Sequence, residues 1–167
     1  MSKFSADEIF EMAEQIERNG ASFYHKAAAQ TANEQTRQVL EDLARMEDEH
    51  GATFAAMRAE LTGAETAHTS FDPQGQVGLY LRAFVDGKVF DVGADPAAQL
   101  SGSETLQEVL GKAIALEKDS IVFYLGIRQV VPGKLGAEKI ERIIQEEMSH
   151  IRILSDALDA GIIDRGG

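Results

Sequence analysis

The sequence predicts an all-α protein in which two antiparallel helical hairpins, four long helices in total, are joined by a long crossover. Three observations indicate this fold class. Apolar residues recur at helical spacing over four long stretches, and the 167 residues include only three prolines. In addition, the two ends of the chain resemble each other at an offset of 100 positions. Two copies of so long a period indicate a duplicated helical hairpin rather than a solenoid.

The first hairpin is expected over residues 5–61. A capping box, Ser5-x-x-Glu8, predicts the start of a helix over 5–30. A second helix is expected over 34–61, with Gly63 at the position of a C-terminal cap. Because only a few residues separate the two helices, they must run antiparallel.

The middle segment, 62–102, is too long for a simple loop and predicts a crossover with one or two short helices. One is expected over 76–87 and another over 95–100, where an Asp cap precedes a proline. A helix of ~28 residues is ~42 Å long, which the crossover can span. The predicted order is up, down, crossover, up, down. The apolar crossover residues are expected to pack on the bundle or to form a dimer face: Tyr80, Leu81, Phe84, Val89 and Phe90.

The second hairpin is expected over residues 103–160. Ser101 and Ser103 with Glu104 signal the start of a helix over 103–130, and Pro132-Gly133 ends it. The last helix is expected over 135–160. The whole chain, 1–167, is therefore predicted to be a single domain.

Composition excludes several classes of partner. A formal net charge of −12 argues against binding nucleic acid or an anionic membrane surface, since both require basic patches. No apolar run approaches the ~18 residues of a membrane span, and the N-terminus has no signal-peptide core, so cytoplasmic residence is expected. Cysteine is absent, which excludes disulfides and thiolate ligands.

The repeat carries polar residues as well as apolar ones. Glu17 matches Glu117, and Glu47-x-x-His50 matches Glu147-x-x-His150, with 30 residues between the two glutamates in each half. The midpoints of these pairs fall at positions 32 and 132, within the predicted turns. The four carboxylates are therefore expected at one height in the bundle, on faces that are otherwise apolar.

Four carboxylates in a helical core repel one another unless they are protonated or bound to cations. Two divalent metals would neutralise them, and one imidazole per metal suits iron or manganese better than a structural zinc. The alternatives are a bundle that no longer binds metal and glutamates on solvated faces. Neither explains the apolar residues that flank them.

The segments "IERNGASFY", "MEDEHGATF", "LEKDSIVFY" and "EEMSHIRIL" resemble the helix motifs of the ferritin-like superfamily, and most closely those of rubrerythrin-like proteins that lack the rubredoxin domain. The resemblance implies a di-iron centre in which Glu47 and Glu147 bridge the metals, with manganese or zinc as substitutes. Rubrerythrins proper carry a further Glu where Ser120 stands, so the set is closer to bacterioferritin-type centres. The implied ligands are Glu17, Glu47, His50, Glu117, Glu147 and His150.

The resemblance implies oxidation of Fe(II) with reduction of hydrogen peroxide or dioxygen. Because a rubredoxin-type iron needs four cysteines, the electrons are expected to come from a separate donor protein. The chain is also expected to form a homodimer. Two other functions remain open: iron handling or storage, and a non-catalytic interaction bundle that metal stabilises. A hydroxylase acting on an organic substrate is a weaker alternative.

Several residues near the motifs have secondary roles. Tyr24 and Tyr124 follow the first glutamate of each half by two turns, and we expect their hydroxyls to bond to ligand carboxylates. Glu146 directly precedes Glu147 and is the one rival ligand. It is nevertheless expected on a solvated face, as are Glu14 and Glu49. The two remaining histidines, His25 and His68, are expected at the surface.

Overall fold

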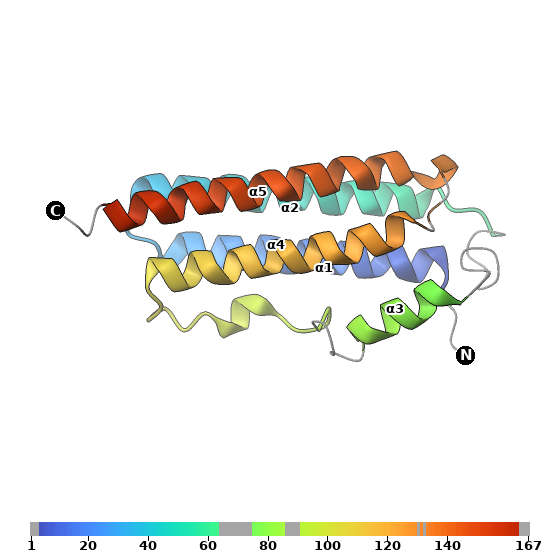
Figure 1. The fold of residues 1–167 in the computed structure, drawn as a ribbon, viewed down its shortest axis with the longest axis horizontal. Coiled ribbons are helices and arrows are strands. Elements are labelled where there is room, and N and C mark those ends of the chain that lie inside the picture. Colours follow the sequence, from blue (N-terminus) through green and yellow to red (C-terminus); the bar gives the residue numbers. More distant parts are fainter. Residues whose placement is uncertain (1–3, 64–74, 86–90, 130, 132, 164–167) are drawn as a thin grey trace.

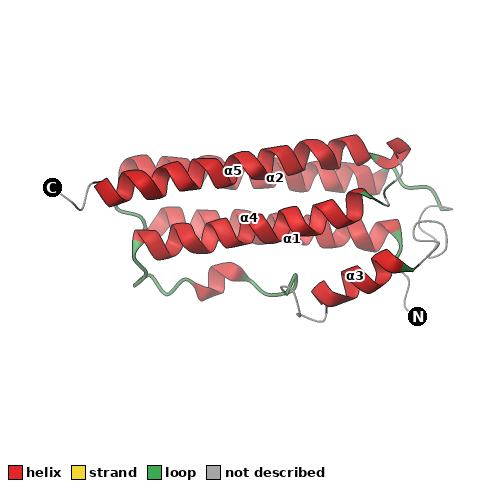
Figure 2. Cartoon of the chain, viewed as in Figure 1, coloured by secondary structure: helices red, strands yellow, loops and turns green. Residues whose placement is uncertain are grey.

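The computed structural model describes residues 4–63, 75–85, 91–129, 131 and 133–163. In these ranges the chain consists of helices and loops, with no strand (Figure 2). Two helical hairpins lie side by side, and the crossover lies against both of them (Figure 1). The elements in chain order are α1 (Ala6–Gln30), α2 (Glu34–Ala59), α3 (Gln76–Val85), η1 (Pro96–Gln99), α4 (Leu106–Arg128), η2 (Gly133–Leu135) and α5 (Ala137–Ile163).

The first hairpin begins as the sequence predicts. The Glu8 carboxylate accepts from the Ser5 backbone N–H at 2.7 Å, and the Ser5 hydroxyl accepts from the Glu8 N–H at 3.2 Å. Asn33 caps α2 by accepting from the Thr36 N–H at 2.9 Å. At the other end, α2 stops at Ala59, before the predicted boundary, so Gly63 is not its cap.

The third long helix begins later than predicted. Thr105 and Glu108 form the capping box of α4. Ser101, Ser103 and Glu104 do not start the helix. The Glu104 carboxylate instead accepts from the backbone N–H groups of Ser101 and Gly102, and these bonds hold a turn ahead of the helix. Position 132, the predicted turn of the second hairpin, lies outside the described residues.

The direction of the second hairpin differs from the predicted order. The crossover runs beside α1 in the same direction, since the Asn19 side chain donates to the Val92 carbonyl oxygen and Lys26 Nζ to the Ala97 carbonyl oxygen. It therefore delivers the chain to the C-terminal end of α1. As a result, α4 runs antiparallel to α1 and parallel to α2 (Figure 1). The order is up, down, crossover, down, up, because the crossover spans the full length of the bundle.

The short helix α3 packs on α4. Leu81 and Phe84 are fully buried, as expected, while Val89, Phe90 and His68 lie outside the described residues. Tyr80 lies so close to Gly126 that a Cβ there would be 2.2 Å from the ring. A glycine at that point of α4 is therefore required for α3 to dock.

The apolar core consists of two clusters. One contains Phe10, Phe54, Phe84 and Phe123 near the N-terminal end of α1, and the other contains Phe23 and residues of the opposite end. A layer of buried polar side chains lies between them. The predicted architecture, two antiparallel hairpins joined by a crossover with short helices, is confirmed. Among the described helices, none has the length and apolar character that crossing a membrane requires.

Candidate metal centre

All four long helices direct polar side chains into the layer between the two apolar clusters. Each of these side chains is almost completely inaccessible to solvent, with at most 4% of the residue exposed. They come from equivalent heights because, in each hairpin, the end of the first helix and the start of the second lie nearly equally far along the chain from the paired glutamates. The six residues are Glu17 on α1, Glu47 and His50 on α2, Glu117 on α4, and Glu147 and His150 on α5.

Helical periodicity explains why the pairs on α2 and α5 face inward. Glu147 and His150 are one turn apart and therefore lie on one face of α5. Ile143 and Leu154 continue this face in both directions and are buried. The same holds on α2, where the flanking residues are Leu43 and Phe54. The packing that buries the apolar neighbours thus carries the polar residues into the core.

The two imidazoles approach the carboxylates through the same ring atom. His50 Nδ1 lies 3.2 Å from Glu147 Oε1 and 3.5 Å from Glu17 Oε2. His150 Nδ1 lies 3.0 Å from Glu147 Oε2, 3.1 Å from Glu47 Oε1 and 3.5 Å from Glu117 Oε1. The rings stack with centroids 5.6 Å apart. One nitrogen of each ring is thus directed into the carboxylate cluster.

Two overlapping groups of side chains have the composition and spacing of metal sites. In each group, one oxygen or nitrogen per residue lies within 4.8 Å of the others. Glu47 and Glu147 belong to both groups, which is the arrangement expected of carboxylates that bridge two metals. The first group adds Glu17 and His50, and the second adds Glu117 and His150.

The donor atoms also have the unmet bonding capacity of a metal site. Both Glu147 oxygens, Glu17 Oε2, Glu47 Oε1 and the Nδ1 atoms of both histidines are buried without a hydrogen bond to any described residue. Buried polar atoms normally have partners, so a cluster of unpaired donors requires explanation. Oxygen and imidazole donors in this number fit two iron, manganese or zinc ions.

Electrostatics in the cluster favour cation binding. Burial, together with the Glu117 and Glu17 carboxylates, raises the pKa of Glu47 well above its usual value. Burial and the Glu47 and Glu117 carboxylates raise the pKa of Glu147 in the same way. Burial raises the pKa of Glu117 too, but the neighbouring His150 imidazole, the Glu147 carboxyl and the Tyr24 hydroxyl lower it by more, so its net shift is downward.

The histidines respond to the same charges. Burial lowers the pKa of His50, but the Glu147 and Glu17 carboxylates raise it by more, to about 11. Burial also lowers the pKa of His150, and Glu117, Glu147 and Glu47 together raise it to about 12. Protons thus balance part of the carboxylate charge, and metal ions compete with them for the same donor atoms.

Both tyrosines bond to the carboxylates, and each does so across the two halves. The Tyr24 hydroxyl donates to Glu117 Oε1, and the Tyr124 hydroxyl donates to Glu17 Oε1. The sequence predicted bonds to carboxylates but not this exchange of partners, which follows from the antiparallel packing of α1 against α4. The Tyr124 hydroxyl occupies Glu17 Oε1 and leaves Glu17 Oε2 facing His50. At Glu117, in contrast, Tyr24 and His150 approach the same oxygen, Oε1.

Glu146 does not occupy the purely solvated position expected from the sequence. Its Oε2 lies 2.7 Å from His50 Nε2, on the side of the ring opposite the carboxylate cluster, and half of its side chain is exposed. Glu146 therefore contacts a candidate ligand from outside. Its position beside Glu147 was the one signal in the sequence. His25, in contrast, is exposed and lies 3.9 Å from Asp48.

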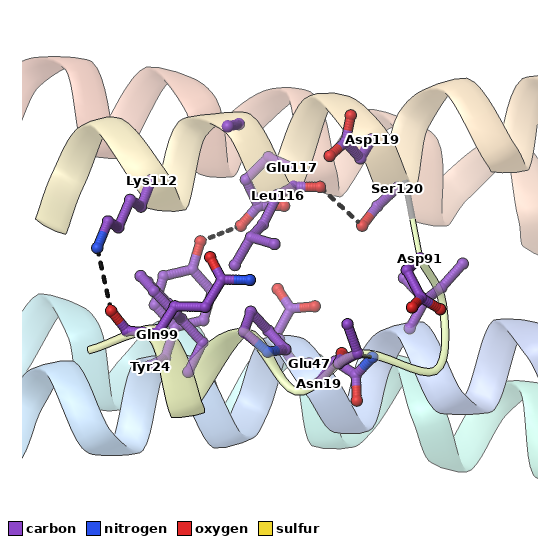
Figure 3. A pocket seen from close by; sticks show the side chains of 16 residues that line it. Asn19, Tyr24, Glu47, Asp91, Gln99, Lys112, Leu116, Glu117, Asp119 and Ser120 are labelled. Atoms are coloured by element: carbon purple, nitrogen blue, oxygen red, sulfur yellow. Dashed lines mark hydrogen bonds between the residues drawn. The ribbon is translucent and has the colours of Figure 1, made fainter. Parts of the chain in front are cut away.

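Cavities reach the cluster from two opposite faces. One, of about 300 Å³, lies between α1 and α4 under the crossover, and Tyr24, Glu47 and Glu117 form part of its wall (Figure 3). Gly20 borders it, and a Cβ there would lie 3.0 Å from Glu47 Oε2. The other, of about 270 Å³, lies between α2 and α5, and His50 and His150 form part of its wall.

Comparison with known proteins supports the fold. The chain is similar to the solved structure of a candidate ferritin-like diiron-carboxylate protein from Thermotoga maritima, with a TM-score of 0.73 and 23% sequence identity. The match covers 95% of this chain and 97% of the other. No protein-family model and no curated protein matches the sequence. The chain therefore has a ferritin-like fold, with a buried glutamate and histidine cluster where its four long helices meet.

Proposed function

We propose that this protein is a di-iron carboxylate redox protein that oxidises Fe(II) and reduces hydrogen peroxide or dioxygen. One observation carries the proposal: two metal-sized groups of buried donors share Glu47 and Glu147 at the centre of the bundle. The description of the Thermotoga maritima protein as a diiron-carboxylate protein supports the same assignment. Cytoplasmic residence, a homodimer and a separate electron-donor protein belong to this proposal.

The first metal would be held by Glu17 and His50, the second by Glu117 and His150, and both by Glu47 and Glu147. When bound, a pair of iron(II) ions supplies the two electrons that convert one hydrogen peroxide and two protons into two water molecules. Tyr24 and Tyr124 orient the two outer glutamates through their hydroxyl groups. The apolar clusters on either side keep bulk water from the donors.

The proposal is tested by loading the metal-free protein with two equivalents of Fe(II) under argon and mixing it with hydrogen peroxide or oxygen in a stopped-flow spectrometer. Absorbance of Fe(III) is expected to rise faster than in protein-free buffer. Glu147→Gln is expected to abolish this acceleration, because Glu147 belongs to both groups. Glu49→Gln, an exposed change on α2, is the matched control and is expected to react like the unmodified protein. Binding without accelerated oxidation would overturn the redox assignment.

A second candidate function is oxidation of a small organic molecule at the same centre. The cavity between α1 and α4 favours it, since its volume of about 300 Å³ lies at the lower end of the ~300–1,000 Å³ range of small-molecule sites. Its wall includes apolar side chains from both helices, among them Ile16, Phe23 and Leu116. An organic product formed in stoichiometric yield with oxygen consumption would favour this function over peroxide reduction.

Storage and a purely structural role make different predictions. A storage protein is expected to assemble into a large cage, which size-exclusion chromatography distinguishes from the monomer or dimer expected here. A bundle that only uses metal to stabilise its fold would gain thermal stability from Fe(II) but show no accelerated oxidation.

A further inference from the structure

The two halves of the chain repeat the metal-facing residues but not the residues behind the histidines. At the offset of 100, every candidate ligand and both tyrosines have a counterpart of the same type. Position 146 is a glutamate, whereas its counterpart at position 46 is a methionine. The difference lies next to the candidate centre, on the face between α2 and α5.

The environments of the two imidazoles differ accordingly. His50 Nδ1 faces the carboxylate cluster, and its other nitrogen, Nε2, lies 2.7 Å from Glu146 Oε2. His150 Nδ1 faces the cluster in the same way, but its Nε2 is buried without a hydrogen bond to any residue that the structure describes. Met46 lines the cavity beside it and offers only a weak thioether acceptor.

A carboxylate behind a ligating histidine has known consequences. It accepts the proton of the outer nitrogen, which fixes the tautomer and leaves the inner nitrogen free to bind metal. It also orients the ring and increases the basicity of the donor. Loss of such a partner commonly weakens metal binding by ~10- to 100-fold.

We infer that the two metal positions are unequal: the position formed with His50 binds metal more tightly and fills first, because Glu146 orients its histidine, whereas Met46 offers no carboxylate to the outer nitrogen of His150. The inference rests on the metal centre proposed above and assigns Glu146 as a positioning residue. Its carboxylate is not a ligand, since it contacts the nitrogen that points away from the cluster. The expected difference in affinity is ~10- to 100-fold.

Repulsion between two bound cations would also make the second one bind more weakly, so the test isolates each position. In His150→Ala the intact group is the one with His50, and in His50→Ala it is the one with His150. Each variant is titrated with Co(II) by calorimetry, and the visible absorbance of bound Co(II) reports its coordination. The His150→Ala protein is expected to bind one Co(II) ~10- to 100-fold more tightly than the His50→Ala protein.

Addition of Glu146→Gln to each background assigns the cause. In His150→Ala it is expected to weaken Co(II) binding by ~10- to 100-fold, and Glu146→Asp is expected to restore part of the loss. In His50→Ala it is expected to change nothing. Conversely, Met46→Glu is expected to tighten binding only in the His50→Ala background. Glu49→Gln, which alters another residue lining the same cavity, is the control that leaves both affinities unchanged.

The outcomes are distinguishable. Equal Co(II) affinities in the two single-histidine variants, or a loss on Glu146→Gln that is the same in both backgrounds, would overturn the inequality while leaving the metal centre intact. Failure of the unmodified protein to bind Co(II) at all would overturn the centre itself. Circular dichroism melting of each metal-free variant confirms that the compared proteins are folded.

Discussion

Glu147 offers the sharpest test of the idea that the polar layer is maintained for metal binding at the expense of stability. The residue is 0% exposed, and neither carboxylate oxygen has a hydrogen bond to a described residue. Its neighbours Glu47 and Glu117 add like charge and raise its pKa further. In the metal-free protein this side chain should destabilise the fold, so Glu147→Leu is expected to make that form more stable.

The expected gain follows from the burial of the group. Replacement of a buried ion pair by apolar residues of similar volume can stabilise a protein by ~1–4 kcal/mol. The same range is expected for Glu147 alone, because the four buried carboxylates outnumber the two imidazoles that balance their charge. For a chain of this length, 1 kcal/mol corresponds to ~2–4 °C in the unfolding midpoint, so the expected rise is ~2–16 °C. The metal-loaded form should respond oppositely, because Glu147 belongs to both groups of donors. Unmodified protein gains ~2.7 kcal/mol per site at a metal concentration 100 times the dissociation constant, and the variant should gain far less.

The measurement is urea unfolding at pH 7, followed by circular dichroism, with chelator or with Co(II). Glu49→Leu, at an exposed position of α2, is the control and should change the free energy of unfolding by less than ~0.5 kcal/mol. A metal-free Glu147→Leu protein that is less stable than the unmodified one would refute the reasoning. That result would mean that the carboxylate makes favourable contacts in the protein alone.

Three further predictions address the same layer. The folded-state pKa values of His50 and His150 are about 11 and 12, against 6.5 for the free imidazole. The metal-free protein should therefore lose stability as the pH rises above 6.5, whereas its affinity for Co(II) should rise. Thermal melts at pH 6.5 and 9 test the first expectation, and calorimetry at the same pH values tests the second. Gly20→Ala places a Cβ 3.0 Å from Glu47 Oε2 and should weaken Co(II) binding. Gly111→Ala meets nothing within 4 Å, so it should leave the Co(II) affinity unchanged and stabilise its helix by ~0.5–1 kcal/mol. Calorimetry measures the affinities, and urea unfolding measures the stability. Tyr124→Phe leaves Glu17 Oε1 without its hydroxyl donor and should lower the free energy of unfolding by ~1–3 kcal/mol, as measured with urea. An unchanged unfolding midpoint would mean that this hydrogen bond does not contribute to stability.

The candidate ligands could be identified from the sequence because helical geometry is local. The spacing of Glu147 and His150 fixes their common face, and the midpoint of each hairpin sets the level of its glutamates. The duplication then supplied an internal control, since chance rarely repeats both features. The structure brings all six predicted residues into one buried cluster.

Contacts between the two hairpins could not be derived in this way. The predicted direction of α4 was wrong because nothing local in the sequence states along which helix the crossover runs. The hydroxyl of Tyr24 bonds to Glu117 rather than to a glutamate of its own half only because α1 and α4 are antiparallel. The contact of Glu146 with His50 likewise depends on how α5 is rotated against α2. Each of these features requires the relative placement of helices that are distant in sequence.

The unrepeated parts of the chain also explain how a duplicated bundle can have two different faces. The crossover lies along α1 and covers the cavity that reaches Glu47 and Glu117 from the α1 and α4 side. On the opposite side, the cavity between α2 and α5 is lined by both histidines and by the half-exposed Glu146. A metal pair in symmetric donors would therefore meet different surroundings on its two sides. A symmetric site needs only the repeated residues. Variants of the crossover should therefore change access to the metals without changing the donors, whereas variants of Glu146 should change binding at one metal position.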